Sequence, residues 1–182
     1  MFHNILDKGE PPRADDGNTR VQALPTGLPL SYPPGVKPAA QGYLHQYQNE
    51  HGVWIIAPKN RPQRSFLEKD EQAAFVGWLR HNKIPHHSIP NSAASSAASG
   101  AEFKRQGLVA GAPDLLVLLP YNKLLAIEMK RECGKISDIS PEQEVMLAIY
   151  ATLPSSSVCV AFGRYAAMDF VRQAWDSPTT NS

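Results

Sequence analysis

Two apolar runs joined by a short polar turn constrain the fold of this chain more than any other part of its sequence. Residues 115–119 read Leu-Leu-Val-Leu-Leu, residues 124–129 are apolar apart from one glutamate, and Pro-Tyr-Asn-Lys separates the two runs. Short apolar runs on either side of turn-forming residues are typical of β-strands joined by a tight connection. The sequence therefore predicts an antiparallel β-hairpin.

The hairpin is expected to bring charged side chains together at its open end. Antiparallel pairing across a short loop places Asp114 opposite residues 128–130. Side chains alternate along a strand, so Glu128 and Lys130 share one face, whereas Met129 takes the other. Two carboxylates and one ammonium group should therefore converge at one end of an apolar hairpin.

Such a cluster is costly to bury unless something compensates its charge. Two neighbouring carboxylates repel each other, and burial without a partner raises a pKa or destabilises the fold. Mg²⁺ prefers oxygen ligands, usually one or two carboxylates, with water and phosphate completing its coordination. Asp114 and Glu128 provide that set, and Lys130 can hold an attacking water or neutralise charge on a phosphate.

The residues around this cluster resemble a known family. Pro113-Asp114, followed after thirteen residues by Glu128-Met129-Lys130, resembles the signature of the PD-(D/E)xK nuclease superfamily. Further elements narrow the resemblance to the small VRR-NUC domains of phage and bacterial proteins: Ile89-Pro90-Asn91, Lys104-x-x-Gly107-Leu108, Gly111-x-Pro113 and Ser140-Pro141-Glu142-Gln143. The likeness covers residues 66–171.

The resemblance implies a restriction-endonuclease-like core. We expect an α/β fold in which a small mixed sheet contains the hairpin and a strand at 158–162, with helices on both faces and a last helix over 166–175. The resemblance also implies Mg²⁺ or Mn²⁺ bound by Asp114, Glu128 and the Met129 carbonyl. Lys130 would orient or deprotonate the water.

A helix over residues 66–82 is expected to approach this site. Ser65 is the expected N-cap, since Glu68 three residues later completes a capping box. In VRR-NUC-like proteins a glutamate four residues before a glutamine on this helix approaches the metal, and Glu68 with Gln72 matches that spacing. Glu71 is the alternative carboxylate. The expected apolar stripe of this helix comprises Phe75, Val76 and Leu79, and Trp78 is expected at its border.

A second helix is expected to begin beside the site. Ser140 can cap it, with Pro141 at its first position. Gln143 then lies on the first turn and faces back toward the cluster, where its amide can hold a water or a phosphate oxygen. This makes Gln143 a candidate catalytic residue.

The charge balance leaves nucleic-acid binding to local clusters. The net charge is only +1, whereas nucleic-acid binders are commonly strongly basic. Candidate contacts to nucleic acid flank the hairpin or belong to the Ile-Pro-Asn element: Asn91, Lys104, Arg105, Arg131 and Lys135.

The N-terminal third differs in composition from the rest. Nine of the sixteen prolines fall within residues 1–62, which we interpret as a largely extended or disordered arm that can recruit a protein partner. Within it, residues 53–56 can form a short strand that extends the sheet at its edge, embraces a second subunit, stacks on bases or packs on its own domain. Residues 63–176 form the expected nuclease-like domain, and residues 177–182 a frayed tail.

Two absences in the sequence bear on location and redox state. No apolar run reaches the length of a membrane span, and the first residues match no secretory signal, so we expect a cytosolic protein of a bacterium or phage-infected cell. The two cysteines, Cys133 and Cys159, lack zinc-ligand neighbours and are expected to be free thiols.

Taken together, these features favour a metal-dependent DNA endonuclease. The resemblance implies structure-selective cutting of branched DNA by a homodimer, as in Holliday-junction resolvases or flap nucleases. One alternative is a catalytically idle protein that holds DNA and recruits a partner through the proline-rich arm. Another is a restriction or repair endonuclease with a sequence or lesion preference.

Overall fold

A computed structural model describes residues 29–40, 42–89, 102 and 105–177. They form one mixed six-stranded sheet whose strands lie in the order β1-β2-β6-β5-β4-β3. β2, β6 and β5 run parallel to one another, and the remaining neighbours are antiparallel. The strands span β1 Leu44–Gln48, β2 Trp54–Pro58, β3 His86–Ser88, β4 Leu115–Leu119, β5 Lys123–Lys130 and β6 Ser156–Phe162.

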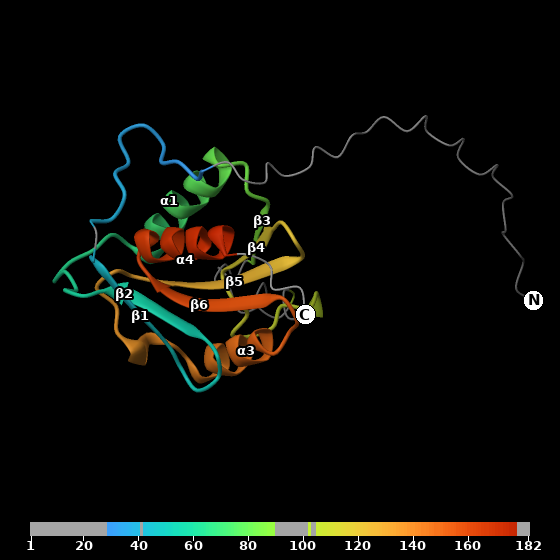
Figure 1. Cartoon of the computed structure of the whole chain (residues 1–182). Coiled ribbons are helices and arrows are strands. Elements are labelled where there is room, and N and C mark those ends of the chain that lie inside the picture. The colour runs from blue at the N-terminus through green and yellow to red at the C-terminus, as the bar shows by residue number, and fades with distance from the viewer. Residues whose placement is uncertain (1–28, 41, 90–101, 103–104, 178–182) are drawn as a thin grey trace, which may run out of the picture.

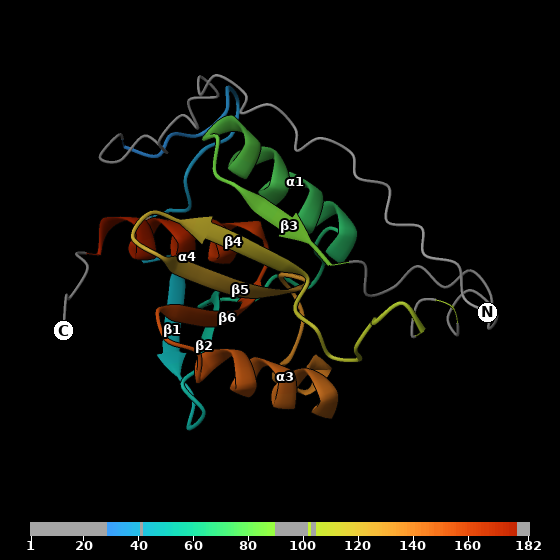
Figure 2. The ribbon, with the colours of Figure 1, turned by 90° about the vertical axis from the view of Figure 1, so that its right-hand side faces the viewer.

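Helices cover both faces of the sheet (Figures 1 and 2). α1 (Glu68–His81) and α4 (Arg164–Asp176) lie on one face, and α3 (Pro141–Ala151) lies on the other with a short 3₁₀ turn before it, η1 (Ile136–Asp138). This three-layer arrangement confirms the expected α/β fold, a small mixed sheet with helices on both faces.

Alternation along β5 divides the core into two layers. Leu125, Ile127 and Met129 belong to the apolar cluster shared with α1 and α4, whereas Ala126 belongs to the cluster on the α3 face. The same alternation puts Glu128 and Lys130 on the α3 face of the strand. The apolar body of β5 therefore fixes which side of the sheet receives its two charged residues.

The predicted hairpin is confirmed. β4 pairs antiparallel with β5, with Leu115 opposite Ile127. Tyr121 and Asn122 in the connection both have positive φ, at 63° and 59°, a conformation that asparagine adopts readily. Extending the register by one residue places Asp114 opposite Glu128, within the range expected from the sequence.

The start of α1 differs from expectation. The helix begins at Glu68 instead of residue 66, and Leu67 is its N-cap without any side-chain cap. Ser65 does not cap the helix, because its hydroxyl donates to the Phe66 carbonyl and contacts the Cys133 sulfur. Trp78 is fully buried in the core, not at the border of the stripe, since Tyr32 and Phe75 pack against its ring.

The predicted arm over residues 1–62 needs correction where the structure describes it. β1 and β2 form an antiparallel hairpin, and β2 joins the sheet by parallel pairing with β6. Ile55, Ile56 and Ala57 are buried, so this segment packs on its own domain. Residues 1–28, a little under half of the predicted arm, lie outside the described residues, as does the tail after residue 177.

The C-terminal elements extend slightly beyond the predicted limits. β6 begins at Ser156, two residues before the expected strand, and α4 begins at Arg164, directly after Gly163. Cys133 and Cys159 are free thiols, as expected, and burial raises the pKa of the Cys159 thiol. Within the described part of the chain, no helix is both long and apolar enough to cross a membrane.

Gly111 places the start of α3 against the segment that leads to β4. Its φ is +81°, and a Cβ atom there would lie 2.2 Å from the Glu142 carbonyl oxygen and 2.7 Å from the Gln143 nitrogen. Both neighbours are backbone atoms that cannot rotate away. Gly107 also has a positive φ, +101°, but a Cβ atom there would meet nothing within 4 Å.

This contrast gives a matched pair of substitutions. We expect Gly107→Ala to cost only the strain of the left-handed conformation, about 1–2 kcal/mol. Gly111→Ala adds a backbone clash and should cost about 1–3 kcal/mol more in the free energy of unfolding. Urea denaturation of both variants measures the difference, and equal losses would show that α3 does not pack on Gly111 as described.

Candidate functional site

Sheet topology gathers four connections at one edge. Because β2, β5 and β6 are parallel, their carboxyl ends lie at the same edge of the sheet. β4 runs antiparallel to β5, so Asp114, which precedes β4, lies at that edge as well. Ligands of open α/β sheets commonly bind beyond the carboxyl ends of the strands. The predicted cluster therefore lies at the edge where such sheets commonly bind ligands.

Asp114 is fixed by backbone contacts on both sides. Its carbonyl oxygen accepts a hydrogen bond of 2.9 Å from the Ile89 amide, and its carboxylate Oδ2 accepts one of 2.8 Å from the Met129 amide. The Met129 side chain is buried in the core, so Met129 presents only its backbone to the site. The half-buried Asp114 carboxylate is thus hydrogen-bonded to the end of β5, next to Glu128.

Glu128, Lys130 and Gln143 form one contact group. The Lys130 ammonium donates to Glu128 Oε1 at 2.9 Å and to Gln143 Oε1 at 3.1 Å. The Gln143 amide nitrogen also donates to Glu128 Oε1. The structure therefore places Gln143 where the sequence predicted it, on the first turn of α3 and facing the end of β5.

The start of α3 holds that glutamine in place. The Ser140 hydroxyl accepts a hydrogen bond of 3.3 Å from the Gln143 backbone amide. In return, the Ser140 backbone amide donates to the side-chain oxygen Oε1 of Gln143 at 2.9 Å. This reciprocal pair is a capping box, and Pro141 follows at the first helical position. The expected cap at Ser140 is confirmed, and the same contacts orient the amide that touches Lys130 and Glu128.

The second oxygen of Glu128 distinguishes this group from an ordinary buried ion pair. Glu128 is only 1% exposed, and its Oε2 has no hydrogen-bond partner among the described residues. Burial raises the pKa of Glu128 to about 7, with a further upward contribution from the Asp114 charge, while Lys130 lowers it. A buried carboxylate oxygen without a partner is costly, which is a state that a bound cation relieves.

The structure separates the two candidate glutamates of α1. Burial raises the pKa of Glu68, and the charges of Lys130 and Asp114 alter it further, in opposite directions, so Glu68 lies within electrostatic reach of the cluster. Glu71 is buried elsewhere, because its Oε2 accepts from the Arg164 amide at 3.0 Å and from Arg164 Nε at 2.7 Å. Glu68 is therefore the helix carboxylate next to the site.

The Glu71–Arg164 pair was missed from the sequence. Glu71 caps the start of α4 through the Arg164 amide, where Gly163 offers no side chain. Gly163 in turn donates its amide to the Lys130 carbonyl at 2.9 Å. The pair therefore supports the end of β5 from the opposite face. The sequence gives no local signal for it, because the two residues are 93 positions apart along the chain.

The expected nucleic-acid contacts are only partly placed. Asn91 and Lys104 lie outside the described residues. Arg105 is exposed and forms a bidentate pair with Glu102, with hydrogen bonds of 2.7 and 2.8 Å. Arg131 and Lys135 are exposed in the loop after β5, and the Arg131 charge lowers the pKa of Glu68. Of the described candidates, Arg131 is shown to lie within electrostatic reach of the cluster.

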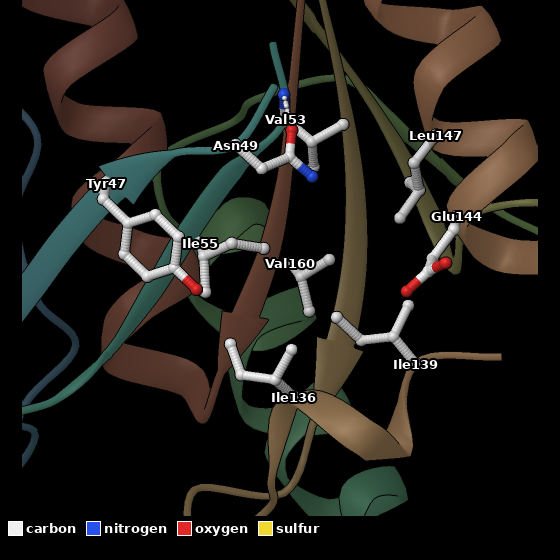
Figure 3. A pocket seen from close by; sticks show the side chains of 9 residues that line it. All are labelled: Tyr47, Asn49, Val53, Ile55, Ile136, Ile139, Glu144, Leu147 and Val160. Atoms are coloured by element: carbon white, nitrogen blue, oxygen red, sulfur yellow. Dashed lines mark hydrogen bonds between the residues drawn. The ribbon is translucent and has the colours of Figure 1, made fainter. Parts of the chain in front are cut away.

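A pocket on the α3 face does not coincide with this group (Figure 3). Val53, Ile55 and Val160 from the sheet face Ile136, Ile139 and Leu147, with Tyr47, Asn49 and Glu144 at its margin. Asp114, Glu128 and Lys130 do not line it. This apolar pocket is therefore separate from the candidate site.

The donor set of the cluster fits a hard divalent cation. Across the described residues, no three side chains of histidine, cysteine, aspartate or glutamate are close enough to form a ready-made metal site. Mg²⁺ commonly takes only one or two carboxylates from a protein and keeps water or phosphate for its other positions. Asp114 and Glu128 meet that requirement, since Glu128 Oε2 has no hydrogen-bond partner in the described part of the chain.

Comparisons with known proteins add a structural likeness. No protein-family model matches the sequence, and no curated protein matches it. A solved structure described as a VRR_NUC domain protein is similar, with 23% sequence identity and a TM-score of 0.49. The match covers 61% of this chain and 89% of that chain.

The raised pKa of Glu128 predicts a pH-dependent stability of the metal-free protein. The folded state keeps a proton that the unfolded state releases near pH 4.5, so this group stabilises the fold at low pH. Its contribution falls as the pH rises from 4.5 to about 7, by on the order of 3 kcal/mol. Chemical denaturation across this range, compared with Glu128→Gln, isolates the effect. Parallel stability profiles for the two proteins would contradict it.

Proposed function

We propose that this chain is a divalent-metal-dependent endonuclease that hydrolyses phosphodiester bonds in DNA. The observation that carries the proposal is the Glu128 carboxylate. One of its oxygens is held by Lys130 and Gln143, the other is buried without a partner among the described residues, and Asp114 lies beside it. This combination of two carboxylates and a lysine at a strand edge suits hydrolysis of a phosphate ester.

Mg²⁺ or Mn²⁺ would be held by Asp114, Glu128 and the Met129 carbonyl, with Glu68 to one side. The bound cation would supply Lewis-acid activation of water and stabilisation of the phosphate charge. The donor chemistry supports this assignment, because all of these ligands offer oxygen, which both cations prefer.

Lys130 is the residue proposed to act on the substrate. The residue is only 6% exposed, and its ammonium group is held by Glu128 and Gln143. The position of the ammonium group is therefore fixed before any substrate arrives. A fixed ammonium can donate to a phosphate oxygen or orient the attacking water where charge develops. Gln143 positions this lysine and can also hold a water or phosphate oxygen.

Branched DNA and a two-fold dimer are the finer parts of this proposal. They rest on the sequence resemblance to VRR-NUC domains, together with the rule that symmetric cutting of two strands suits a two-fold dimer. Light scattering at micromolar concentration checks the dimer. A monomer that cuts a four-way junction at full rate would refute it.

Cleavage of a panel of labelled DNAs with Mg²⁺ or Mn²⁺ tests the activity itself. The panel contains single-stranded DNA, duplex, flap, splayed-arm and four-way-junction substrates. We expect cutting of the branched substrates, and a loss of at least about 100-fold in Asp114→Asn and Lys130→Gln, because each change removes a charge from the reacting centre. Both replacements retain hydrogen-bonding groups, which limits the damage to the fold.

Asp176→Asn is the matched control, because Asp176 is exposed at the far end of α4. It should cut as the wild type does, and melting curves check that the variants remain folded. Full cleavage activity in a folded Asp114→Asn variant would refute the assignment of this cluster as a nuclease active site. DNA binding without cutting by either metal would favour the idle binding protein instead.

A further inference from the structure

The connection between β2 and α1, residues 59–67, follows the edge of the sheet toward the candidate site. At its start, the Lys59 amide donates to the Tyr43 carbonyl at 2.8 Å. Further along, Arg61 donates to the Gly134 carbonyl, and the Ser65 hydroxyl oxygen lies 3.1 Å from the Cys133 sulfur. The connection therefore lies against the loop that follows Lys130, and both lie on the left side of the molecule in Figure 1.

Arg61 fastens this connection to the sheet. Besides its bond to Gly134, its guanidinium lies 4.7 Å from the centre of the Phe162 ring. Phe162 is the β6 residue paired with Lys130. A cation over an aromatic face adds to the hydrogen bond in holding the segment. The connection is thus attached beside the strand pair that carries the candidate catalytic lysine.

The connection is basic along its length. It reads Lys-Asn-Arg-Pro-Gln-Arg-Ser-Phe-Leu and contains no acidic residue, although the whole chain has a net charge of only +1. Lys59 and Arg64 are exposed and form no ion pair with any described residue. Two unpaired cations on a fastened segment are available to an anionic partner.

The facing loop contributes two more cations. Arg131 and Lys135 are exposed, while the neighbouring carboxylates are partly occupied. Glu132 accepts a hydrogen bond of 2.5 Å from the Tyr43 hydroxyl, and Asp138 accepts one of 2.8 Å from the Lys135 amide. The Arg131 charge reaches Glu68, so this basic surface continues to the carboxylates of the candidate site.

We propose that residues 59–67, together with Arg131 and Lys135, form a phosphate-binding rim that holds the DNA backbone against the candidate site. This inference rests on the proposed function and names its substrate-binding surface. Lys59 and Arg64 are five residues apart, a reach of at most about 17 Å. One strand of DNA carries a phosphate every ~3.4 Å of axial rise, so such a segment can contact several phosphates.

The rim explains how a nearly neutral chain can bind DNA. Contacts to phosphates position a nucleic acid without reading its sequence, and their strength depends on salt. Arg61 serves as the anchor of the rim, whereas Lys59 and Arg64 supply its free charge. Rim binding is therefore expected to be independent of sequence and separable from the metal-dependent chemistry.

The test compares two double variants that each remove one lysine and one arginine. Lys59→Ala/Arg64→Ala removes the free charges of the rim and leaves the Arg61 anchor intact. Arg80→Ala/Lys83→Asn removes exposed charges at the other end of α1, and asparagine suits the positive φ of Lys83, 55°. Binding of a fluorescein-labelled DNA duplex is measured by anisotropy over a range of salt, with a chelator present to prevent cleavage.

We expect the rim variant to bind at least about tenfold more weakly at 0.1 M salt, and its slope of log K against log salt to fall by about 1.8, or 0.9 per lost contact. The control variant should keep the wild-type slope. Three results would each contradict the proposed rim. They are an unchanged slope in the rim variant, an equal fall of the slope in the control variant, and no binding of the duplex by the wild type.

Cleavage is scored separately, so that the two proposals fail in different ways. If the wild type cuts DNA while the rim variant binds with an unchanged slope, the rim is wrong and the nuclease assignment stands. If the rim variant shows the expected loss of binding but the wild type cuts nothing with either metal, the rim stands and the proposed nuclease function fails.

Discussion

The rest of the candidate site depends on one buried contact, the Lys130 ammonium on the Glu128 carboxylate. Both residues lie at the end of a strand whose central side chains fill the core, and Glu128 is only 1% and Lys130 only 6% exposed. A buried pair of this kind is a weak source of stability, because desolvation offsets most of its attraction. Its retention at a sheet edge, with one carboxylate oxygen lacking a partner among the described residues, is better explained by a use for that oxygen.

The surrounding elements are arranged to hold this pair from both faces. On the α3 face, Gly111 lets the helix approach closely enough for Gln143 to contact both charged groups. On the opposite face, Glu71 and Arg164 fix the start of α4, and Gly163 bonds to the Lys130 carbonyl. The site is therefore preorganised by helix starts, whose unsatisfied amides need partners in any case.

The sequence predicted the parts of the site that depend on local order. The hairpin, the position of Asp114 opposite Glu128 and the cap at Ser140 follow from strand alternation and capping chemistry within short stretches. It left open whether residues 53–56 join the sheet and did not predict β1, since β6, the parallel partner of β2, is about a hundred residues away along the chain. The choice between Glu68, the preferred candidate, and Glu71 stayed open for the same reason, because Arg164 binds Glu71 from a distant helix.

The topology also explains why charge can gather at this edge without a basic composition. Three parallel strands end side by side, so the connections that follow them meet in space although they lie far apart in the sequence. Lys59 to Arg64 follow β2, and Arg131 to Lys135 follow β5. Total charge averages over the whole chain and hides this concentration, whereas a phosphate backbone responds to the local field. A net charge near zero is therefore compatible with binding to DNA at one edge of the sheet.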